Sequence, residues 1–495
     1  MNTSTAEQFD LVVVGGGPSG ATLAALVAMR GHRVMLLEKE RFPRYQIGES
    51  LLPATVHGVG KLLGVTEELE KASFTKKLGG TFRWGSKPEP WTFTFAISQK
   101  LAGPTSHAYQ VERMKFDKIL LDNARRVGVD VREECSVNDV IKAGDRVTGL
   151  RYTDADGIVR EVSATFVADA SGNRSRLHKN TGGKRVYSEF FQNVALFGYF
   201  EGGKRLPAPR SGNILSAAFD DGWFWYIPLT EKLTSVGAVV ARERADQIQG
   251  DPEKALLKLI DRCPEVRDML SEARRVTEGT YGEIRVRKDY SYCGTAFWSP
   301  GMVLVGDAAC FVDPVFSSGV HLATYSGLLA ARSINSVLAG EIDEKRSFEE
   351  FEQRYRREYG LFYEFLVGFY DMHHDEQSYF WKAKKVTKAN TSDIEAFVEL
   401  VGGAASGDSS LAGMRLEQTA GQLAAAVDSV GVEARRDGEQ NAPLFRSAIV
   451  GEVMQESARV QARAALGHAL NDEDPLFSGG LVPSGDGMAW VVPAV

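Results

Sequence analysis

The chain has 495 residues, too many for one ordinary hydrophobic core, so we expect two or three structural units. Its hydrophobic fraction of 43% is typical of a globular protein, and its net charge of −7 argues against non-specific binding to nucleic acid. The four cysteines form no C-x-x-C pair, so neither a zinc site nor a disulfide framework is indicated, and a reducing, cytoplasmic setting is the simplest interpretation.

The first predicted element is a buried strand at residues 11–14 that leads into a glycine-rich turn. Gly15, Gly17 and Gly20 fit the pattern G-x-G-x-x-G, and an Ala- and Leu-rich helix follows. The first glycine allows a tight turn, the second lets a pyrophosphate approach the backbone, and the third lets the helix pack closely on the strand. Glu38, at the end of the next apolar run, can accept hydrogen bonds from a ribose. We therefore predict a dinucleotide site, for NAD or FAD.

The uncharged run at residues 11–29 is near the length of a membrane span. It contains four glycines and a proline, and the acidic Glu7 and Asp10 precede it where a signal peptide would be basic. The dinucleotide turn accounts for these glycines, so we expect no membrane partner.

The other elements follow from periodicity and from turn residues. In chain order we predict a helix at 54–69, a turn at 76–80, a strand at 91–97, a helix at 116–126, short strands between 129 and 167, a broad antiparallel sheet at 194–240, a buried strand at 302–305, a helix at about 320–339 and long helices beyond 347. This order predicts an α/β fold with a Rossmann-like βαβ unit and an interleaved antiparallel β-sheet. We expect a core at 1–345, with the sheet region at about 80–110 and 180–300, and a mostly helical C-terminal region at 346–495.

Three further segments favour FAD over NAD. Arg113 opens a helix, which places its guanidinium where it can reach phosphate or ribose, Asp169 begins the turn Asp-Ala-Ser-Gly after an apolar strand, and Asp307 follows Gly306 after another. Each is unspecific alone, because an acid after a strand is often a structural cap. In this order they resemble the flavoprotein monooxygenases of the para-hydroxybenzoate hydroxylase type. In that family the aspartate corresponding to Asp307 contacts the ribityl chain, and the next helix points at the flavin ring.

No second glycine-rich fingerprint appears, so no resident NAD(P)H domain is evident. From these patterns and this resemblance we expect the FAD contacts to come from Gly15, Gly17, Ser19, Gly20, Glu38, Lys39, Ser50, Arg113, Asp307, Gly319 and Val320.

Residues 222–228 contain the motif W-x-W-x-I-P, formed by Trp223, Trp225, Ile227 and Pro228. This motif resembles the flavin-dependent halogenases of the same superfamily. In them it crowds the flavin face, so that substrate cannot meet the activated flavin directly. Trp223 and Trp225 share one face at period two, so an ordinary aromatic core strand is the alternative.

Lys77, in Lys76-Lys77-Leu78-Gly79-Gly80, matches the catalytic lysine of these halogenases. The resemblance implies that it lies at the end of a tunnel between flavin and substrate, where its amine captures or hydrogen-bonds hypochlorous acid. A buried lysine loses much of its preference for the charged form, and the neutral amine is the nucleophile required. Lys76 is the competing candidate, and a surface lysine pair is the alternative.

Phe316-Ser317-Ser318-Gly319-Val320 resembles the chloride-binding segment of the family. Backbone amides at a loop-to-helix junction suit an anion, and we carry the halide site over to Ser318 and Gly319. Tryptophan halogenases have a glutamate just before these residues, whereas this chain has Phe316. A phenol activates its own ortho carbons, so this difference fits a phenolic substrate.

Glu49, in Gly48-Glu49-Ser50, matches a family position near the flavin, and we place it with Lys77 as a candidate catalytic residue. An ordinary helix-capping acid is the alternative. We expect no metal site, because His321, His373 and His374 have no carboxylate or cysteine partner at metal-ligand spacing.

The resemblance is strongest to the halogenases of glycopeptide-antibiotic pathways, the vancomycin, balhimycin and teicoplanin type. The segments that carry it are 44–53, 79–85, 306–323, 363–369 and 378–381. It implies chlorination of the phenolic ring of a tyrosine-derived residue, such as β-hydroxytyrosine, tethered to a peptidyl carrier domain.

The resemblance also implies that a separate flavin reductase supplies FAD as FADH2, with chloride and O2 as co-substrates. Hypochlorous acid would pass along a tunnel lined by Trp223 and Trp225, with Phe316 at the flavin face, to Lys77. One alternative is an FAD-dependent aromatic hydroxylase, which chloride dependence would distinguish. The other is a non-catalytic flavin-binding protein that docks on a carrier domain through its helical tail.

Overall fold

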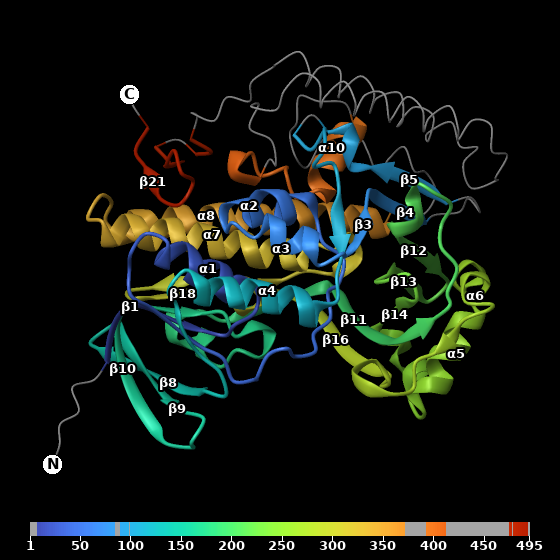
Figure 1. Cartoon of the computed structure of the whole chain (residues 1–495), viewed down its shortest axis with the longest axis horizontal. Coiled ribbons are helices and arrows are strands. Elements are labelled where there is room, and N and C mark those ends of the chain that lie inside the picture. The colour runs from blue at the N-terminus through green and yellow to red at the C-terminus, as the bar shows by residue number, and fades with distance from the viewer. Residues whose placement is uncertain are drawn as a thin grey trace.

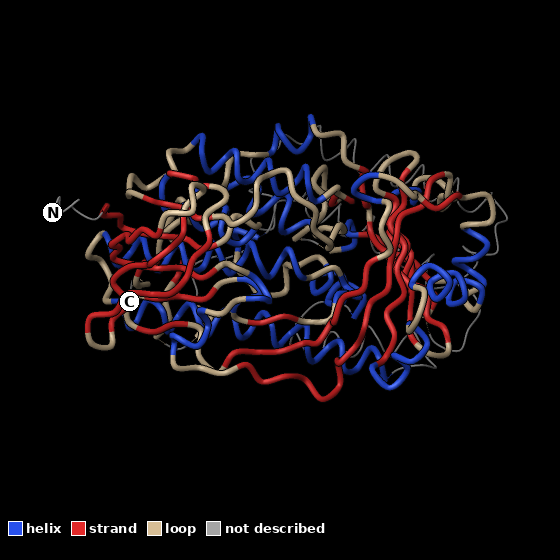
Figure 2. The backbone as a smooth tube through the Cα atoms, turned by 90° about the horizontal axis from the view of Figure 1, so that it is seen from below, coloured by secondary structure: helices blue, strands red, loops and turns tan. Residues whose placement is uncertain are grey.

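The computed structural model describes residues 7–84, 90–98, 100–371, 393–411, 475–477 and 479–493. Two groups of strands lie toward opposite ends of the long axis, and the long helices run between them (Figures 1 and 2). The predicted α/β class with two interleaved sheets is confirmed. The segment at 378–381, His373 and His374 lie outside the described residues.

The first sheet is built on the predicted dinucleotide-binding strand. Its path is β17 (Trp298–Ser299), β18 (Met302–Leu304), β10 (Val159–Asp169), β1 (Glu7–Val14), β2 (Val34–Leu37) and β7 (Asp130–Arg132), and the hairpin β8 (Ser136–Ala143) and β9 (Arg146–Thr153) extends β10. The central ladders are parallel. Leu11, Val12 and Val13 are fully buried, as expected for a parallel strand covered on both faces.

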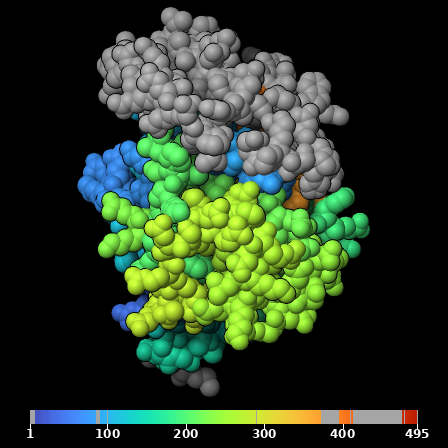
Figure 3. Space-filling view, turned by 90° about the vertical axis from the view of Figure 1, so that its right-hand side faces the viewer, coloured from blue at the N-terminus to red at the C-terminus, as the bar shows by residue number. Residues whose placement is uncertain are grey.

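The second sheet is antiparallel over most of its width. Its path is β19 (Cys310–Phe311), β16 (Arg285–Gly294), β11 (Arg185–Glu201), β14 (Leu233–Ala241), β13 (Gly222–Pro228), β12 (Ile214–Phe219), β4 (Gly79–Arg83) and β5 (Trp91–Thr94), with β15 (Arg274–Arg275) beside β11. On β13, Trp223 and Trp225 pack into the main core, whereas Phe224 and Tyr226 face a separate apolar cluster. Side chains of β11, β12 and β14 share that cluster, and helices α5 (Pro252–Asp261) and α6 (Pro264–Met269) pack on it and lie on the end face seen in Figure 3.

The remaining helices lie between and over the two sheets. They are α1 (Pro18–Ala28), α2 (Gly60–Leu62), α3 (Thr66–Lys71), α4 (Arg113–Arg126), α7 (Gly319–Leu338), α8 (Glu344–Asp371) and α10 (Asp393–Val401). Helix α7 packs against α1 and α8 in the centre of Figure 1.

The described C-terminal residues end in a small hairpin, β20 (Val482–Pro483) and β21 (Trp490–Val491), rather than in a helix. The hairpin is anchored on α7, because Trp490 is fully buried and its indole donates to the Ser333 hydroxyl at 3.0 Å.

Two local predictions are wrong. The stretch 54–69 is not one helix, because Gly64 has a φ of +68° and separates a π-helical turn at Ala54–Val59 and α2 from α3. The stretch 76–80 is not a turn, because Lys77 ends the strand β3 (Thr75–Lys77), which pairs with β6 (Ala108–Gln110). That pairing joins residues more than 30 apart in sequence, so local turn chemistry could not reveal it.

The uncharged run at 11–29 is divided between β1, the glycine turn and α1. Across the described ranges, none of the helices has the length and apolar character needed to cross a bilayer.

Candidate active site

The glycine turn has the close contacts that its pattern predicts. Gly15 has a φ of +104°, and a Cβ at Gly20 would lie 1.9 Å from the Gly15 carbonyl oxygen. Helix α1 starts at Pro18 with no side-chain cap, so its first amides are available to a phosphate. Glu38 is 5% exposed, and its carboxylate accepts from the Gly16 amide at 2.6 Å. The predicted ribose acid therefore lies beside the predicted phosphate turn.

Arg44 is a candidate phosphate-binding residue that the sequence analysis did not assign. Its Nη2 lies 3.5 Å from the position of a Cβ on Gly17, and its Nη1 donates to Asp117 at 3.0 Å. Asp117 also accepts from Arg113 Nε at 2.7 Å. In the sequence, the i, i+4 spacing of Arg113 and Asp117 on α4 could have revealed this cluster.

Arg113 is turned toward the loop before Glu49. Its Nη1 donates to the carbonyl oxygen of Ile47 at 2.5 Å and to that of Gly48 at 3.2 Å. Only 6% of Arg113 is exposed. Arg113 thus fixes the loop that carries Glu49, and Arg44 lies closer to the phosphate turn.

The three predicted FAD segments converge. A Cβ on Gly15 would lie 2.6 Å from the Ala170 carbonyl oxygen, and one on Gly306 would lie 2.8 Å from Ser19 Oγ. Burial raises the pKa of Asp307 to about 6, and the guanidinium groups of Arg113 and Arg185 oppose that rise. Uncapped helix amides, a ribose acid, an arginine and an aspartate at this junction fit an FAD.

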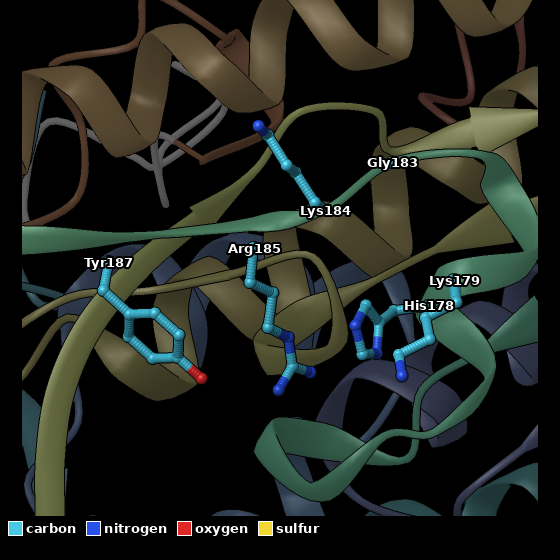
Figure 4. A pocket seen from close by; sticks show the side chains of 6 residues that line it. All are labelled: His178, Lys179, Gly183, Lys184, Arg185 and Tyr187. Carbon is cyan, nitrogen blue, oxygen red and sulfur yellow. The ribbon is translucent and has the colours of Figure 1, made fainter.

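A basic surface hollow of about 530 Å³ adjoins this junction. It is lined by His178, Lys179, Gly183, Lys184, Arg185 and Tyr187 (Figure 4). Arg185 and His178 point to the same side, whereas Lys184 points away. Arg185 Nη1 donates to the Asn173 carbonyl oxygen at 2.6 Å, and its Nε has no partner. Of the residues that line the hollow, Arg185 brings a positive charge close enough to Asp307 to lower the pKa of that carboxyl.

Lys39 lies at the edge of the cluster, since its side chain is 59% exposed and pairs with Glu40 at 3.8 Å. Its role toward FAD stays a prediction.

Lys77 and Lys76 differ sharply in their surroundings. Lys77 is 3% exposed, and its Nζ donates to Ser50 Oγ at 2.8 Å and to the Leu51 carbonyl oxygen at 3.0 Å. Burial lowers the pKa of Lys77 to about 7, so a large fraction of the amine is neutral near neutral pH. Lys76 points to solvent. The two residues are therefore not a surface pair.

Glu49 precedes the serine that holds Lys77. It is 2% exposed, and burial raises the pKa of its carboxyl to about 7. The Tyr199 hydroxyl donates to its Oε1 at 2.7 Å, and Oε2 has no hydrogen-bond partner. The carboxylate caps no helix, so the helix-capping alternative is wrong. At pH 7 a carboxyl group with this pKa is present in both its protonated and its ionised form.

The two tryptophans of W-x-W-x-I-P are tied to different parts of the site. Trp223 Nε1 donates to the Tyr370 hydroxyl at 2.6 Å, and that hydroxyl donates to Asp313 Oδ2 at 3.0 Å. Trp225 Nε1 donates to Ser235 Oγ at 3.1 Å, and the Ser235 side chain lowers the pKa of Glu49. Ile227 and Pro228 are buried at the end of β13.

Asp313 lies three residues before the predicted halide segment at 316–320. Its side chain caps a short 3-10 turn at Pro314–Phe316, and Ser317 then adopts a φ of +61°. Ser318 is fully buried with no partner for its hydroxyl, and a Cβ on Gly319 would meet no atom within 4 Å. The start of α7 therefore offers an unpaired hydroxyl and open space to a small anion. Val320, in the first turn of α7, is buried.

Phe316 lies in an aromatic cluster, with its ring centroid 4.8 Å from that of Phe369 and 5.1 Å from that of Phe365. His321, one turn into α7, does have a carboxylate partner: its Nε2 lies 2.7 Å from Glu358 Oε1. Within the described part of the chain, no group of three or more His, Cys, Asp or Glu side chains could hold a metal ion.

The fold and these residues fit a flavoprotein, in which the buried Lys77 contacts Ser50 and helix α7 packs on α1 behind the glycine turn. The chain matches the tryptophan halogenase family over residues 10–104 and 96–427, and it belongs to that family. Its members are flavin-dependent halogenases that use FAD, a halide and O2, with reduced flavin from a separate reductase.

Similar proteins agree with this assignment. The tryptophan 2-halogenase of Chondromyces crocatus is 33% identical and covers 86% of this chain and 81% of its own length. The flavin-dependent halogenase gsfI of Penicillium aethiopicum is 32% identical, over 71% of this chain and 69% of its own length. The solved structure of the myxobacterial chondrochloren halogenase CndH, described as a new variant of FAD-dependent halogenases, is 54% identical, covers 98% of this chain and all of that one, and has a TM-score of 0.75.

Proposed function

We propose that this halogenase chlorinates the phenolic ring of a tyrosine-derived residue, such as β-hydroxytyrosine, while that residue is tethered to a peptidyl carrier domain. The observation that carries the proposal is Phe316, which stands among Phe365 and Phe369 immediately before the halide loop. This apolar position cannot take up a ring proton or orient a charged species. A phenol needs less of such help, because its oxygen activates the ortho carbons. The resemblance of this chain to glycopeptide-pathway halogenases also favours a tethered phenolic substrate.

Bound reduced FAD would supply, with O2 and chloride, the oxidised halogen. Glu38, Arg44 and the start of α1 would hold its adenosine and phosphates, and Asp307 its ribityl chain. Ser318 and Gly319 would hold the halide at the start of α7. These residues would thus bring the halide and the flavin together on one side of β13.

Lys77 would act on the oxidised halogen. Ser50 Oγ and the Leu51 carbonyl oxygen accept two hydrogen bonds from its amine and so orient the Nζ lone pair. Because burial holds its pKa near 7, the amine can be neutral and nucleophilic at working pH. Trp223 and Trp225 would exclude the organic substrate from the flavin face. Glu49 would exchange protons near Lys77, since its pKa is also about 7.

The region at 346–495 is proposed to serve as a lid or as the docking site of the carrier domain. Tyr370, near the end of α8, bonds both to Trp223 and to Asp313, and Phe369 packs on Phe316. A carrier that contacted this end of α8 would therefore act directly on the W-x-W strand and the halide loop.

The test is a comparison of three substrates with flavin reductase, FAD, NADH and chloride. A carrier-tethered tyrosine derivative, free tyrosine and free tryptophan are incubated separately, and mass spectrometry reads the chlorine isotope pattern. We expect chlorine on the tethered phenol and much less on either free amino acid. Preferential chlorination of free tryptophan would overturn the proposed substrate. Oxygen insertion that does not depend on chloride would instead support an aromatic hydroxylase.

A further inference from the structure

Two of the four cysteines face one another across neighbouring strands. Cys293, near the end of β16, is in register with Cys310, the first residue of β19, in an antiparallel ladder. The Gly294 amide donates to the Ala309 carbonyl oxygen at 2.8 Å, so Cys293 and Cys310 form a non-hydrogen-bonded pair. In such pairs the Cα atoms are about 4.5 Å apart and both side chains point to the same face. That separation is within the range that a disulfide spans.

Helix α8 covers this face. Arg356 Nη1 donates to Cys293 Sγ at 3.3 Å, and Arg356 Nη2 donates to the Gly294 carbonyl oxygen at 2.9 Å. The preceding residue, Tyr355, faces Cys310. Cys310 is only 1% exposed, whereas Cys293 is half-buried. An oxidant from solvent therefore reaches Cys293 first.

The two thiols also differ in their electrostatic surroundings. Burial raises the pKa of both. At Cys310 the rise is large, whereas at Cys293 the Arg356 guanidinium donates a hydrogen bond to the sulfur, opposes the rise and favours the thiolate. Cys293 thus has the character of an attacking thiol, and Cys310 that of the thiol that resolves the product.

The pair lies beside the predicted flavin turn. Tyr292, next to Cys293, donates its hydroxyl proton to the carbonyl oxygen of Asp307, and Cys310 is three residues beyond Asp307. Tyr355 donates to the Gly306 carbonyl oxygen at 3.3 Å. An oxidant made next to the flavin and lost toward this side of the fold therefore approaches the thiol pair.

We propose that Cys293 and Cys310 are a modification site, a thiol pair that forms a reversible disulfide and so consumes hypochlorous acid that escapes from the reaction. The source of that oxidant rests on the proposed function. The Cys293 sulfur attacks the chlorine of hypochlorous acid, which gives a sulfenyl chloride and water. The Cys310 sulfur then attacks the Cys293 sulfur, the S–S bond forms, chloride leaves and one proton is released. Both thiols lose one electron each, and the chlorine is reduced to chloride.

The direct test adds one equivalent of hypochlorous acid to the whole protein and alkylates the remaining thiols before peptide mapping. We expect the loss of two alkylatable thiols, a peptide pair joined through Cys293 and Cys310, and recovery of both thiols with dithiothreitol. Cys135 and Cys263 are buried away from this pair and serve as internal controls. Equal loss of Cys135 and Cys263, or oxidation of Cys293 to sulfonic acid without a link, would overturn the proposal.

The variants Cys293→Ser and Cys310→Ser separate the two roles. In Cys310→Ser we expect Cys293 to be trapped by a sulfenic-acid probe, whereas in Cys293→Ser we expect Cys310 to stay alkylatable. Rapid oxidation of Cys310 in Cys293→Ser would contradict the assigned order. Far-ultraviolet circular dichroism checks that both variants fold.

A second arm generates the oxidant by turnover without an organic substrate, with and without chloride. A chloride-dependent link between Cys293 and Cys310 supports the whole proposal. A link that forms with added hypochlorous acid but not during turnover would leave the disulfide site supported and would count against the oxidant of the proposed function.

Discussion

Lys77 Nζ donates a hydrogen bond of 2.8 Å to Ser50 Oγ, and this bond joins the end of β3 to the loop that carries Glu49. It fixes a buried amine whose pKa is about 7 rather than the ordinary 10.5. The unfolded chain therefore binds one more proton than the folded chain between these two values, and the free energy of unfolding must rise with pH across that window.

Lys77→Met removes this proton linkage. Relative to the variant, the free energy of unfolding of the wild type should rise by about 1.4 kcal/mol per pH unit above pH 7, up to the pKa of the unfolded lysine. Urea unfolding at several pH values measures this change of the free energy of unfolding with pH. Lys76→Met is the matched control, because Lys76 is exposed, and its slope should equal that of the wild type. Identical slopes for Lys77→Met and wild type would show that Lys77 keeps an ordinary pKa.

Tyr199→Phe removes the hydroxyl that donates to Glu49 Oε1 at 2.7 Å. That bond stabilises the charged carboxylate, so its loss should raise the pKa of Glu49 above its value of about 7. Carboxyl infrared bands that are absent from Glu49→Gln give the titration. Tyr45→Phe removes only the hydroxyl that lies 2.7 Å from the Tyr199 hydroxyl, so it should shift the pKa of Glu49 less. A lower pKa in Tyr199→Phe would contradict this reading of the network.

Gly20→Ala should abolish FAD binding. Its Cβ would lie 1.9 Å from the Gly15 carbonyl oxygen, so the glycine turn and α1 would have to separate. Gly360→Ala in α8 is the control, because a Cβ there meets no atom within 4 Å, and it should bind FAD normally. Flavin fluorescence quenching measures the affinity. Normal binding by Gly20→Ala would rule out the close helix-to-strand approach at this turn.

Asp408→Asn should lower the free energy of unfolding by about 3–5 kcal/mol, because it leaves a buried cation without its counter-charge. Arg332 and Asp408 are both fully buried at the side-chain level and are 2.6 Å apart. Arg332 lowers the pKa of Asp408, so the wild type should lose this stabilisation only as the pH falls below the ordinary range of an aspartate. Asp486→Asn, at a half-exposed ion pair with Arg30, is the control and should change stability little.

Features defined within one short segment could be predicted from the sequence. The strand, the glycine spacing and Glu38 lie within a single βαβ unit, and each glycine has a local steric reason. Trp223 and Trp225 share a face because strands alternate, which also needs no distant contact.

Features that join distant segments could not be predicted in this way. Lys77 lies 27 residues from Ser50, and Trp223 lies 147 residues from Tyr370, so neither pairing follows from local periodicity. Arg44 was missed because its loop has no regular pattern, and Glu358 as the partner of His321 depends on how α7 packs on α8. That Cys293 and Cys310 face one another likewise depends on the register between β16 and β19.

In the proposed function, Lys77 carries the oxidised halogen to a tethered phenol. The most direct measurement is product formation by wild type, Lys76→Met and Lys77→Met with flavin reductase, FAD, NADH, chloride and a carrier-tethered tyrosine derivative, with NADH oxidation followed in parallel. We predict chlorinated product from wild type and Lys76→Met, and none from Lys77→Met although it still binds FAD and oxidises NADH. Equal chlorination by Lys77→Met would show that Lys77 does not relay the halogen.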